Sequence, residues 1–335
     1  MKNALINLCV TLGTVLFVFL LLEGYLYIRY ENEYERLHER YADAEYELCT
    51  QGDPDLVYTL IPNRCGFNSM GFDDEEWQQE KSPGVFRIVL IGDSVAQGQG
   101  VTRKARFSSV FEKLWNSSPS RPQIEVLNLA ISGYSTTQQL TVLQETAMAL
   151  GPDLIWWSYV LNDPAHPLFH DGNGELGRYY YRPTWRGGHY IYEKLFEARE
   201  NHLRKSCGQE FHEVLHCVYR EQVVINLAEI GHVVGDTPVL FTIHPLLPQN
   251  STFPDYPHAR IHQDLADMAR GFGYTTIDLS LAFEGRRGES LAVDNGQPWY
   301  DPWHPNAEGH ALKAEYLRAE IEKMGLLSPG STQKR

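Results

Sequence analysis

Two segments far apart in the sequence carry side chains that together could cleave an ester. Gly92-Asp93-Ser94 offers a serine hydroxyl, and Asp301 lies three residues before His304 near the carboxyl end of the chain. At this spacing the carboxylate can orient one ring nitrogen of His304 while the other ring nitrogen faces a nucleophile. These residue types predict a serine nucleophile with an imidazole base, the combination that forms an acyl-enzyme.

Two further segments carry hydrogen-bond donors for the negative oxygen that forms when serine attacks an ester. Gly133, in the segment 128–135, lets the backbone approach a substrate oxygen closely because it has no side chain. The amide of Asn162, in Asn162-Asp163-Pro164, can donate to the same oxygen. Either segment, taken singly, is equally well explained as an ordinary turn.

Three of these segments follow short hydrophobic runs that we predict to be strands; the exception is the segment 301–304. The predicted strands are 86–91, 124–127, 154–159, 239–243 and 275–277, and the predicted helices are 107–115, 136–150, 221–234, 259–271 and about 306–324. Strands that alternate with helices indicate a mainly parallel sheet with helices on both faces. The carboxyl ends of parallel strands meet at one edge, so we expect the four segments to lie close together there.

In combination, the four segments resemble the sequence blocks of the SGNH hydrolase family, also called GDSL-type esterases. Gly92-Asp93-Ser94 is similar to the first block, 128–133 to the second, Asn162-Asp163 to the third and 301–304 to the last. The segments stand in the family's order, and the resemblance covers roughly residues 84 to 326. Four weak motifs in the required order and context are together a specific signal.

The resemblance implies a fold and a set of site residues. The fold is a flavodoxin-like, three-layer α/β/α arrangement with a mainly parallel, five-stranded sheet. The catalytic residues are Ser94, His304 and Asp301. The oxyanion hole is formed by the Ser94 backbone N–H, Gly133 and Asn162.

The sequence departs from the family pattern at two positions. Val95 stands where a leucine is usual, and Val160 stands where the third block usually has a glycine beside Asn162. The segment 68–72 ahead of the domain also resembles membrane-anchored bacterial members, which often accompany surface-polysaccharide systems. That resemblance suggests where the enzyme works rather than which substrate it takes.

The amino terminus carries a hydrophobic segment, residues 4–27, that is long enough to cross a bilayer as a helix. A cleavable signal peptide is the alternative, but no small-x-small cleavage site closes the segment. Lys2 is the only basic residue before it, whereas Arg29, Arg36 and Arg40 follow, a pattern that favours a cytoplasmic domain. Because long domains are translocated largely regardless of charge, we nevertheless predict a single-pass inner-membrane protein with a periplasmic catalytic domain.

The cysteine spacing contributes to this prediction. Outside the hydrophobic segment, Cys49 with Cys65 and Cys207 with Cys217 form two close pairs. Disulfides in both pairs would fit an oxidising compartment, but four reduced thiols fit the spacing as well.

The segment that follows the membrane span shows an apolar seam at helical spacing. Tyr27, Tyr30, Tyr34, Leu37 and Tyr41 recur at intervals of three and four. This stalk helix would pack on the chain's own domain, on a second copy or on a partner subunit, and the sequence does not separate these possibilities.

We therefore divide the chain into four parts. They are a transmembrane anchor (1–28), a helical stalk with an irregular lead-in (29–83), the hydrolase-like domain (84–326) and a tail (327–335). An insertion at 164–220, rich in Tyr, Trp and His, interrupts the domain and is too long for an ordinary connection.

Composition excludes some partners. The net charge of −14 and the lack of a Lys/Arg-rich run argue against nucleic acid. His212 and His216 have the spacing of a metal-binding pair, but no glutamate completes a known motif, so we expect no metal. His244, which follows a predicted strand, is either a pocket residue or a structural one.

The reaction that we expect is hydrolysis of an acyl ester on a carbohydrate or lipid through an acyl-enzyme at Ser94, without a cofactor. Transfer of the acyl group to a sugar hydroxyl would use the same catalytic residues. A noncatalytic membrane-complex subunit that assembles through the stalk helix is the other alternative. The presence of Ser94, Asp301 and His304 favours the enzyme, because a scaffold requires none of them.

Overall fold

The core of the protein is a five-stranded parallel sheet, which confirms the predicted fold class. The computed structural model describes residues 2–41, 48–166, 178–181, 183–208, 210–253, 255–294, 296 and 300–327. The strands are β3 (Phe86–Gly92), β4 (Ile124–Asn128), β5 (Leu154–Tyr159), β6 (Val239–Ile243) and β7 (Thr275–Asp278). Their order is β4-β3-β5-β6-β7, and every boundary lies within one residue of the prediction.

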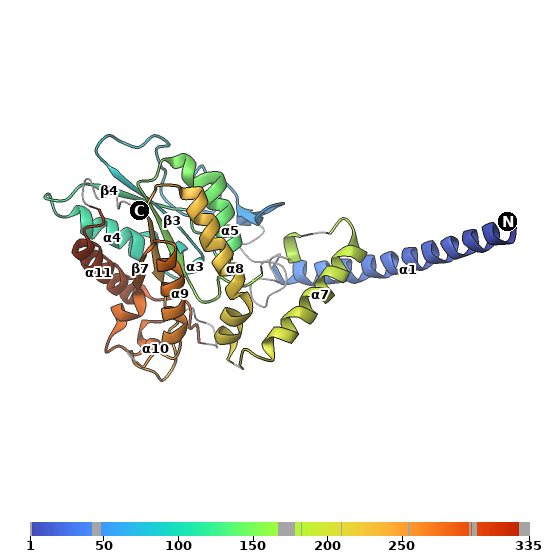
Figure 1. Ribbon diagram of the computed structural model, residues 1–335. Coiled ribbons are helices and arrows are strands. Elements are labelled where there is room, and N and C mark those ends of the chain that lie inside the picture. Colours follow the sequence, from blue (N-terminus) through green and yellow to red (C-terminus); the bar gives the residue numbers. More distant parts are fainter. Residues whose placement is uncertain are drawn as a thin grey trace.

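Helices cover both faces of this sheet (Figure 1). They are α4 (Phe107–Asn116), α5 (Thr136–Val142), α8 (Phe211–Val234), α9 (Ala259–Gly271) and α11 (Ala307–Met324). Because successive strand residues point to opposite faces, Leu90 and Trp156 pack with α4 and α11, whereas Ile91 and Trp157 pack with α5, α8 and α9. The two hydrophobic cores hold the strand ends, and therefore the site, in a fixed frame.

Two helices differ from their predicted limits. The helix expected over 136–150 is α-helical only to Val142 and continues as a π turn and a 3-10 turn before Gly151, which has a φ of 63°. Helix α8 begins at Phe211 instead of 221, because the Glu210 side chain caps it by accepting a hydrogen bond from the Glu213 N–H.

The lead-in contains a β-hairpin that the sequence analysis missed. Strands β1 (Thr50–Asp53) and β2 (Val57–Leu60) pair antiparallel, and the Asp53 carboxylate closes the turn by accepting the N–H groups of Asp55 and Leu56. Each strand has only four residues and no regular alternation of buried and exposed positions, so its periodicity is too weak to detect.

Both cysteine pairs are disulfides in the structure. The Cα atoms of Cys49 and Cys65 are 5.6 Å apart, and those of Cys207 and Cys217 are 5.7 Å apart. The first bond ties the start of the hairpin to the loop behind it, and the second ties the start of α8 to the end of the preceding helix α7 (Arg186–Arg204).

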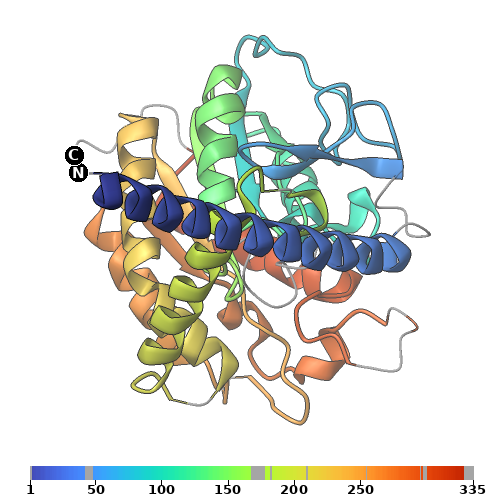
Figure 2. The same cartoon turned by 90° about the vertical axis from the view of Figure 1, so that its right-hand side faces the viewer.

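Helix α1 (Lys2–Tyr41) projects from the body, with its amino terminus at the far end (Figure 1), and it lies in front of the domain in the view of Figure 2. It is long and apolar enough to cross a membrane, a criterion of length and composition that a signal sequence near the amino terminus also meets. Its second half packs on α7: the Tyr30 hydroxyl donates to Glu193, and Arg186 lies over the ring of Tyr27. The seam therefore contacts the chain's own insertion. Residues 167–177, 182 and 209 of the insertion lie outside the described residues.

Candidate active site

Ser94, His304 and Asp301 form a continuous hydrogen-bonded chain. The Ser94 Oγ lies 2.8 Å from His304 Nε2, and His304 Nδ1 lies 2.7 Å from Asp301 Oδ2. Ser94 comes from the end of β3, whereas Asp301 and His304 come from the loop before α11. The fold thus brings together the three residues that were predicted from the sequence. Their geometry is that of a nucleophile, a base and an orienting carboxylate.

The turn that presents Ser94 is held by Asp93 and by a glycine. Asp93 caps the short helix α3 (Ser94–Gln97), its carboxylate accepting the Val95 N–H at 3.0 Å. At Gly92 a Cβ atom would come within 2.7 Å of the Ala96 Cβ and 2.9 Å of the Ser158 carbonyl oxygen. A glycine is therefore required here because β5 and α3 approach too closely for any side chain.

Asp301 is held in its ionised form by local hydrogen bonds. Burial by itself would raise its pKa, but hydrogen bonds from His304 and from the Trp303 and His304 N–H groups outweigh burial and lower the pKa below its ordinary value. The two backbone donors both point at Oδ1, at 2.9 and 3.1 Å. This leaves Oδ2 for the imidazole and fixes the orientation of the ring.

The candidate oxyanion donors lie on loops beside α3. The Ile131 N–H donates to the Gly92 carbonyl oxygen at 3.2 Å, which places the loop of Gly133 against this turn. Gly133 has a φ of 80°, a conformation that favours glycine. Asn162 Nδ2 lies 3.4 Å from Asp93 Oδ2. Within the described chain, the backbone N–H groups of Ser94 and Gly133 donate to no other protein group.

Val160, the departure from the family pattern, lies in the tight turn that carries Asn162. Its side chain is buried, its N–H donates to the Asp163 carboxylate at 3.1 Å, and its carbonyl oxygen accepts the Asp163 N–H at 3.0 Å. Valine is therefore compatible with the closed turn.

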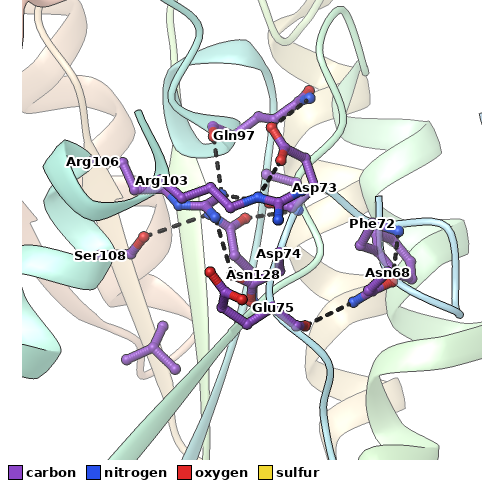
Figure 3. Close-up of polar contacts among 12 residues, drawn as sticks. Asn68, Phe72, Asp73, Asp74, Glu75, Gln97, Arg103, Arg106, Ser108 and Asn128 are labelled. Carbon is purple, nitrogen blue, oxygen red and sulfur yellow. Dashed lines mark hydrogen bonds and ion pairs between the residues drawn. The ribbon is translucent and has the colours of Figure 1, made fainter. Parts of the chain in front are cut away.

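The lead-in forms part of the support for the site (Figure 3). The Asp74 carboxylate accepts hydrogen bonds from the Asn128 N–H at 2.9 Å and from Arg106 at 3.0 Å. Arg106 also donates to the Gln97 carbonyl oxygen at the end of α3, and the Asn128 amide donates to the Ala96 carbonyl oxygen at 2.7 Å. The lead-in is thus connected to the turn of Ser94 by buried polar contacts.

A second buried polar group lies beneath the site, and sequence reasoning missed it. Lys313 is fully buried, and its Nζ lies 3.0 Å from His244 Nδ1, while His244 Nε2 lies 2.8 Å from Ser158 Oγ. Burial lowers the pKa of Lys313 to about 7, although the charge of Asp93 opposes this. His244 is therefore a core residue. Helical spacing could have predicted that Lys313 is buried, because it lies on the same face of α11 as apolar residues such as Leu317.

Two buried carboxylates also neighbour the nucleophile. Burial raises the pKa of Asp93, and burial together with the charge of Asp93 raises the pKa of Asp163.

His212 and His216, whose spacing is that of a metal-binding pair, both lie on α8 but contact different carboxylates. His216 Nε2 is 2.9 Å from Asp264, whereas His212 Nδ1 is 3.1 Å from Glu210.

Comparison with known families places this site in context. A model of the GDSL-like lipase/acylhydrolase family matches residues 90–312 of the chain. The chain belongs to this family. The matched segment of this GDSL-like acylhydrolase contains Ser94, Gly133, Asn162, Asp301 and His304. No curated protein sequence matches the chain.

Solved structures with a similar fold are distant in sequence. One is Axe2, an acetylxylan esterase from Geobacillus stearothermophilus, with 16% identity, a TM-score of 0.45, and coverage of 72% of this chain and 94% of that chain. Another is LAE5, an alpha/beta hydrolase enzyme from the metagenome of Lake Arreo, Spain, with 17% identity, a TM-score of 0.45, and coverage of 73% and 97%.

Proposed function

We propose that this GDSL-like acylhydrolase is a serine esterase that forms its acyl-enzyme at Ser94. The observation that carries the proposal is the chain of short contacts from Ser94 Oγ through His304 to Asp301, at 2.8 and 2.7 Å. His304 accepts the Ser94 proton as the hydroxyl attacks the ester carbonyl carbon, and the ionised Asp301 stabilises the imidazolium. His304 then returns the proton to the leaving alcohol, and the acyl group stays on Ser94.

The oxyanion that forms during attack would be stabilised by donors close to Ser94. The candidates are the N–H groups of Ser94 and Gly133 and the Asn162 amide, which would turn from Asp93 toward the oxyanion. Water, activated by His304, would then attack the acyl-enzyme and release the acid.

For the substrate, we favour an acyl ester on a carbohydrate over one on a lipid. A cavity of about 390 Å³ beside α3, which none of the three catalytic residues lines, is bounded by Thr50, Tyr58, Leu60, Phe67, Asp73, Gln97, Gln99, Ser132 and the Cys49–Cys65 disulfide. Aromatic rings interleaved with amide, hydroxyl and carboxylate groups suit the alternating apolar faces and hydroxyl edges of a sugar. An acyl chain would favour a continuous apolar lining.

We further propose that α1 anchors the enzyme in the inner membrane, with the catalytic domain in the periplasm. The Glu23 carboxylate accepts the N–H of Gly187 in α7, so the membrane-embedded part would end before Glu23. Residues 4–22 form a helix of roughly 28 Å, close to the thickness of a bilayer core. Two disulfides support an oxidising compartment.

The test is active-site labelling of the full-length chain in detergent with a fluorophosphonate probe. Wild type should label, whereas Ser94→Ala and His304→Ala should not, because the first lacks the nucleophile and the second lacks its base. His216→Ala, which changes a histidine outside the site, is the control and should label like wild type. A folded wild-type protein that does not label would refute the esterase function.

Acetylated oligosaccharides then distinguish hydrolysis from transfer. Free acetate as the main product, unchanged by added acceptor sugar, supports the esterase. Acetylation of the acceptor at the expense of acetate would instead identify an O-acyltransferase.

A further inference from the structure

Three potential metal ligands lie together where the end of the insertion meets the loop before α9. Glu210 and His212 flank the start of α8, and His258 immediately precedes α9. One ligand atom from each residue lies within 4.8 Å of the other two. None of the three belongs to the proposed catalytic machinery.

The separations match those of ligands around a single ion. The Glu210 Oε1 lies 3.1 Å from His212 Nδ1, and the Glu210 Oε2 lies 3.8 Å from His258 Nδ1. Zinc bonds to nitrogen and oxygen are about 2.0 to 2.2 Å, so neighbouring ligands of a tetrahedral zinc are roughly 3.3 Å apart. Glu210 and His212 already have this separation, whereas His258 Nδ1 would have to move closer to the carboxylate, whose Oε2 also accepts the Glu213 N–H at 2.8 Å.

The two histidines are buried, and a ring nitrogen of His258 has no hydrogen-bond partner among the residues that the structure describes. The side chains of His212 and His258 are each only 10% exposed. His258 Nδ1 is buried and has no hydrogen-bond partner in the described chain, because its distance to Glu210 is too long for a hydrogen bond. A buried nitrogen without a partner is costly, and a cation between Glu210 and His258 would satisfy it.

We propose that Glu210, His212 and His258 bind one divalent transition-metal ion, with zinc as the first candidate. Two imidazoles and one carboxylate are a common zinc ligand set, with water in the fourth position. Glu210 is exposed, which leaves a side of the site open for that water.

The ion would join the insertion to the loop that follows β6. That loop also reaches the catalytic loop, since the Leu247 N–H donates to the Pro302 carbonyl oxygen at 2.7 Å. From the sequence we expected no metal, because no glutamate completes a known motif with His212 and His216. The ligands proposed here are a different set, in which His258 is far from Glu210 and His212 in the sequence.

The experiment is a zinc titration of the full-length protein in detergent, after removal of bound metal with a chelator. Calorimetry and elemental analysis should give one Zn²⁺ per chain. Glu210→Gln and His258→Gln should each weaken binding by more than about 100-fold, since even second-shell changes cost 10- to 100-fold. His216→Gln, one helical turn from His212, is the matched control and should bind like wild type.

Co²⁺ provides an independent readout, because its visible absorption changes when imidazole and carboxylate replace water. Absence of stoichiometric binding to the wild-type protein would overturn the proposal, as would equal weakening by His216→Gln. If His258→Gln does not fold, Glu210→Gln decides the question, because its side chain is exposed and an amide can still cap α8. Fluorophosphonate labelling of Ser94 is measured separately, so failure of either proposal is seen independently.

Discussion

Asp301 shows how single hydrogen bonds set the chemistry of the site. Two backbone N–H groups and one imidazole converge on its carboxylate, and together they lower its pKa although burial raises it. The carboxylate therefore stays ionised at neutral and mildly acidic pH, where it can stabilise a charged His304.

We predict that Asp301→Asn lowers kcat for ester hydrolysis by about 10³- to 10⁴-fold with little change in KM. The amide cannot stabilise the imidazolium, and it can hold the ring in the wrong tautomer. Steady-state hydrolysis of a chromogenic acetate ester measures this effect. A loss below about tenfold would mean that Asp301 has no role in the reaction.

Lys313 gives a prediction about stability and pH. Its folded pKa of about 7 lies below the value of 10.5 for an exposed lysine, so the unfolded chain binds the extra proton between these values. The penalty for burying the charge is full below pH 7 and is relieved as the pH rises above 7. Wild type should therefore gain stability relative to Lys313→Met by up to about 1.4 kcal/mol per pH unit above pH 7.

Urea unfolding of both proteins at pH 7, 8 and 9 tests this prediction, and the difference in the free energy of unfolding is the quantity to compare. Comparison with Lys313→Met removes the contribution of the titrating groups that Lys313 does not influence; the pKa values of His244 and His310, which its charge lowers, change with it. Parallel stability curves for the two proteins would show that Lys313 does not titrate in this range.

At the scale of elements, the lead-in is fastened to the domain by two adjacent carboxylates in different surroundings. The Asp74–Arg106 pair is buried, whereas the Asp73–Arg103 pair keeps more than a quarter of each side chain exposed, 27% and 28%. Neighbouring residues thus offer a matched comparison of a buried and an accessible ion pair.

Asp74→Asn should destabilise the fold by roughly 3 kcal/mol, because it leaves the Arg106 charge buried without a counter-charge. Asp73→Asn should cost no more than about 1 kcal/mol, as exposed pairs do. Chemical denaturation compares them, and Asp74→Asn should also lower activity because Asp74 supports Asn128 and the end of α3. Equal costs for the two variants would contradict this assignment.

For the molecule as a whole, the disulfide of Cys49 and Cys65 should contribute about 3 kcal/mol, because it closes a loop of 16 residues in the unfolded chain. Replacing both by serine should lower the free energy of unfolding by this amount under oxidising conditions. Cys9→Ser is the control, since Cys9 is a free, exposed cysteine. If a reductant leaves wild-type stability unchanged, the bond does not form in the purified protein.

The packing of α1 on α7 leads to a prediction about truncation. A chain that starts at Glu23 should leave the membrane fraction and keep its thermal stability, because the contacts of Glu23, Tyr27 and Tyr30 with α7 remain. A chain that starts at Gln51 should lose part of this stability, because it lacks these contacts and the Cys49 disulfide. Fractionation and thermal unfolding of both proteins measure the difference.

The alternation of strands and helices and the four segments of the site could be predicted from the amino-acid sequence. Periods of two and 3.6 are properties of neighbouring residues, so the strands of the sheet could be placed to within one residue. The nearness of the Gly133 and Asn162 loops to Ser94 was also foreseeable, since parallel strands deliver their ends to one edge of the sheet. The contact with His304 was expected only from the family resemblance, because the segment 301–304 follows no strand of the sheet.

Contacts between residues that share no local sequence pattern could not be predicted and became visible in the three-dimensional structure. Three such contacts join segments that are far apart in the chain. They are the pairing of Lys313 with His244, the cluster of Glu210, His212 and His258, and the packing of the stalk on the insertion. Each depends on how helices pack, and packing is set by the shape and volume of many side chains at once. The spacing of residues along the sequence therefore does not predict these contacts.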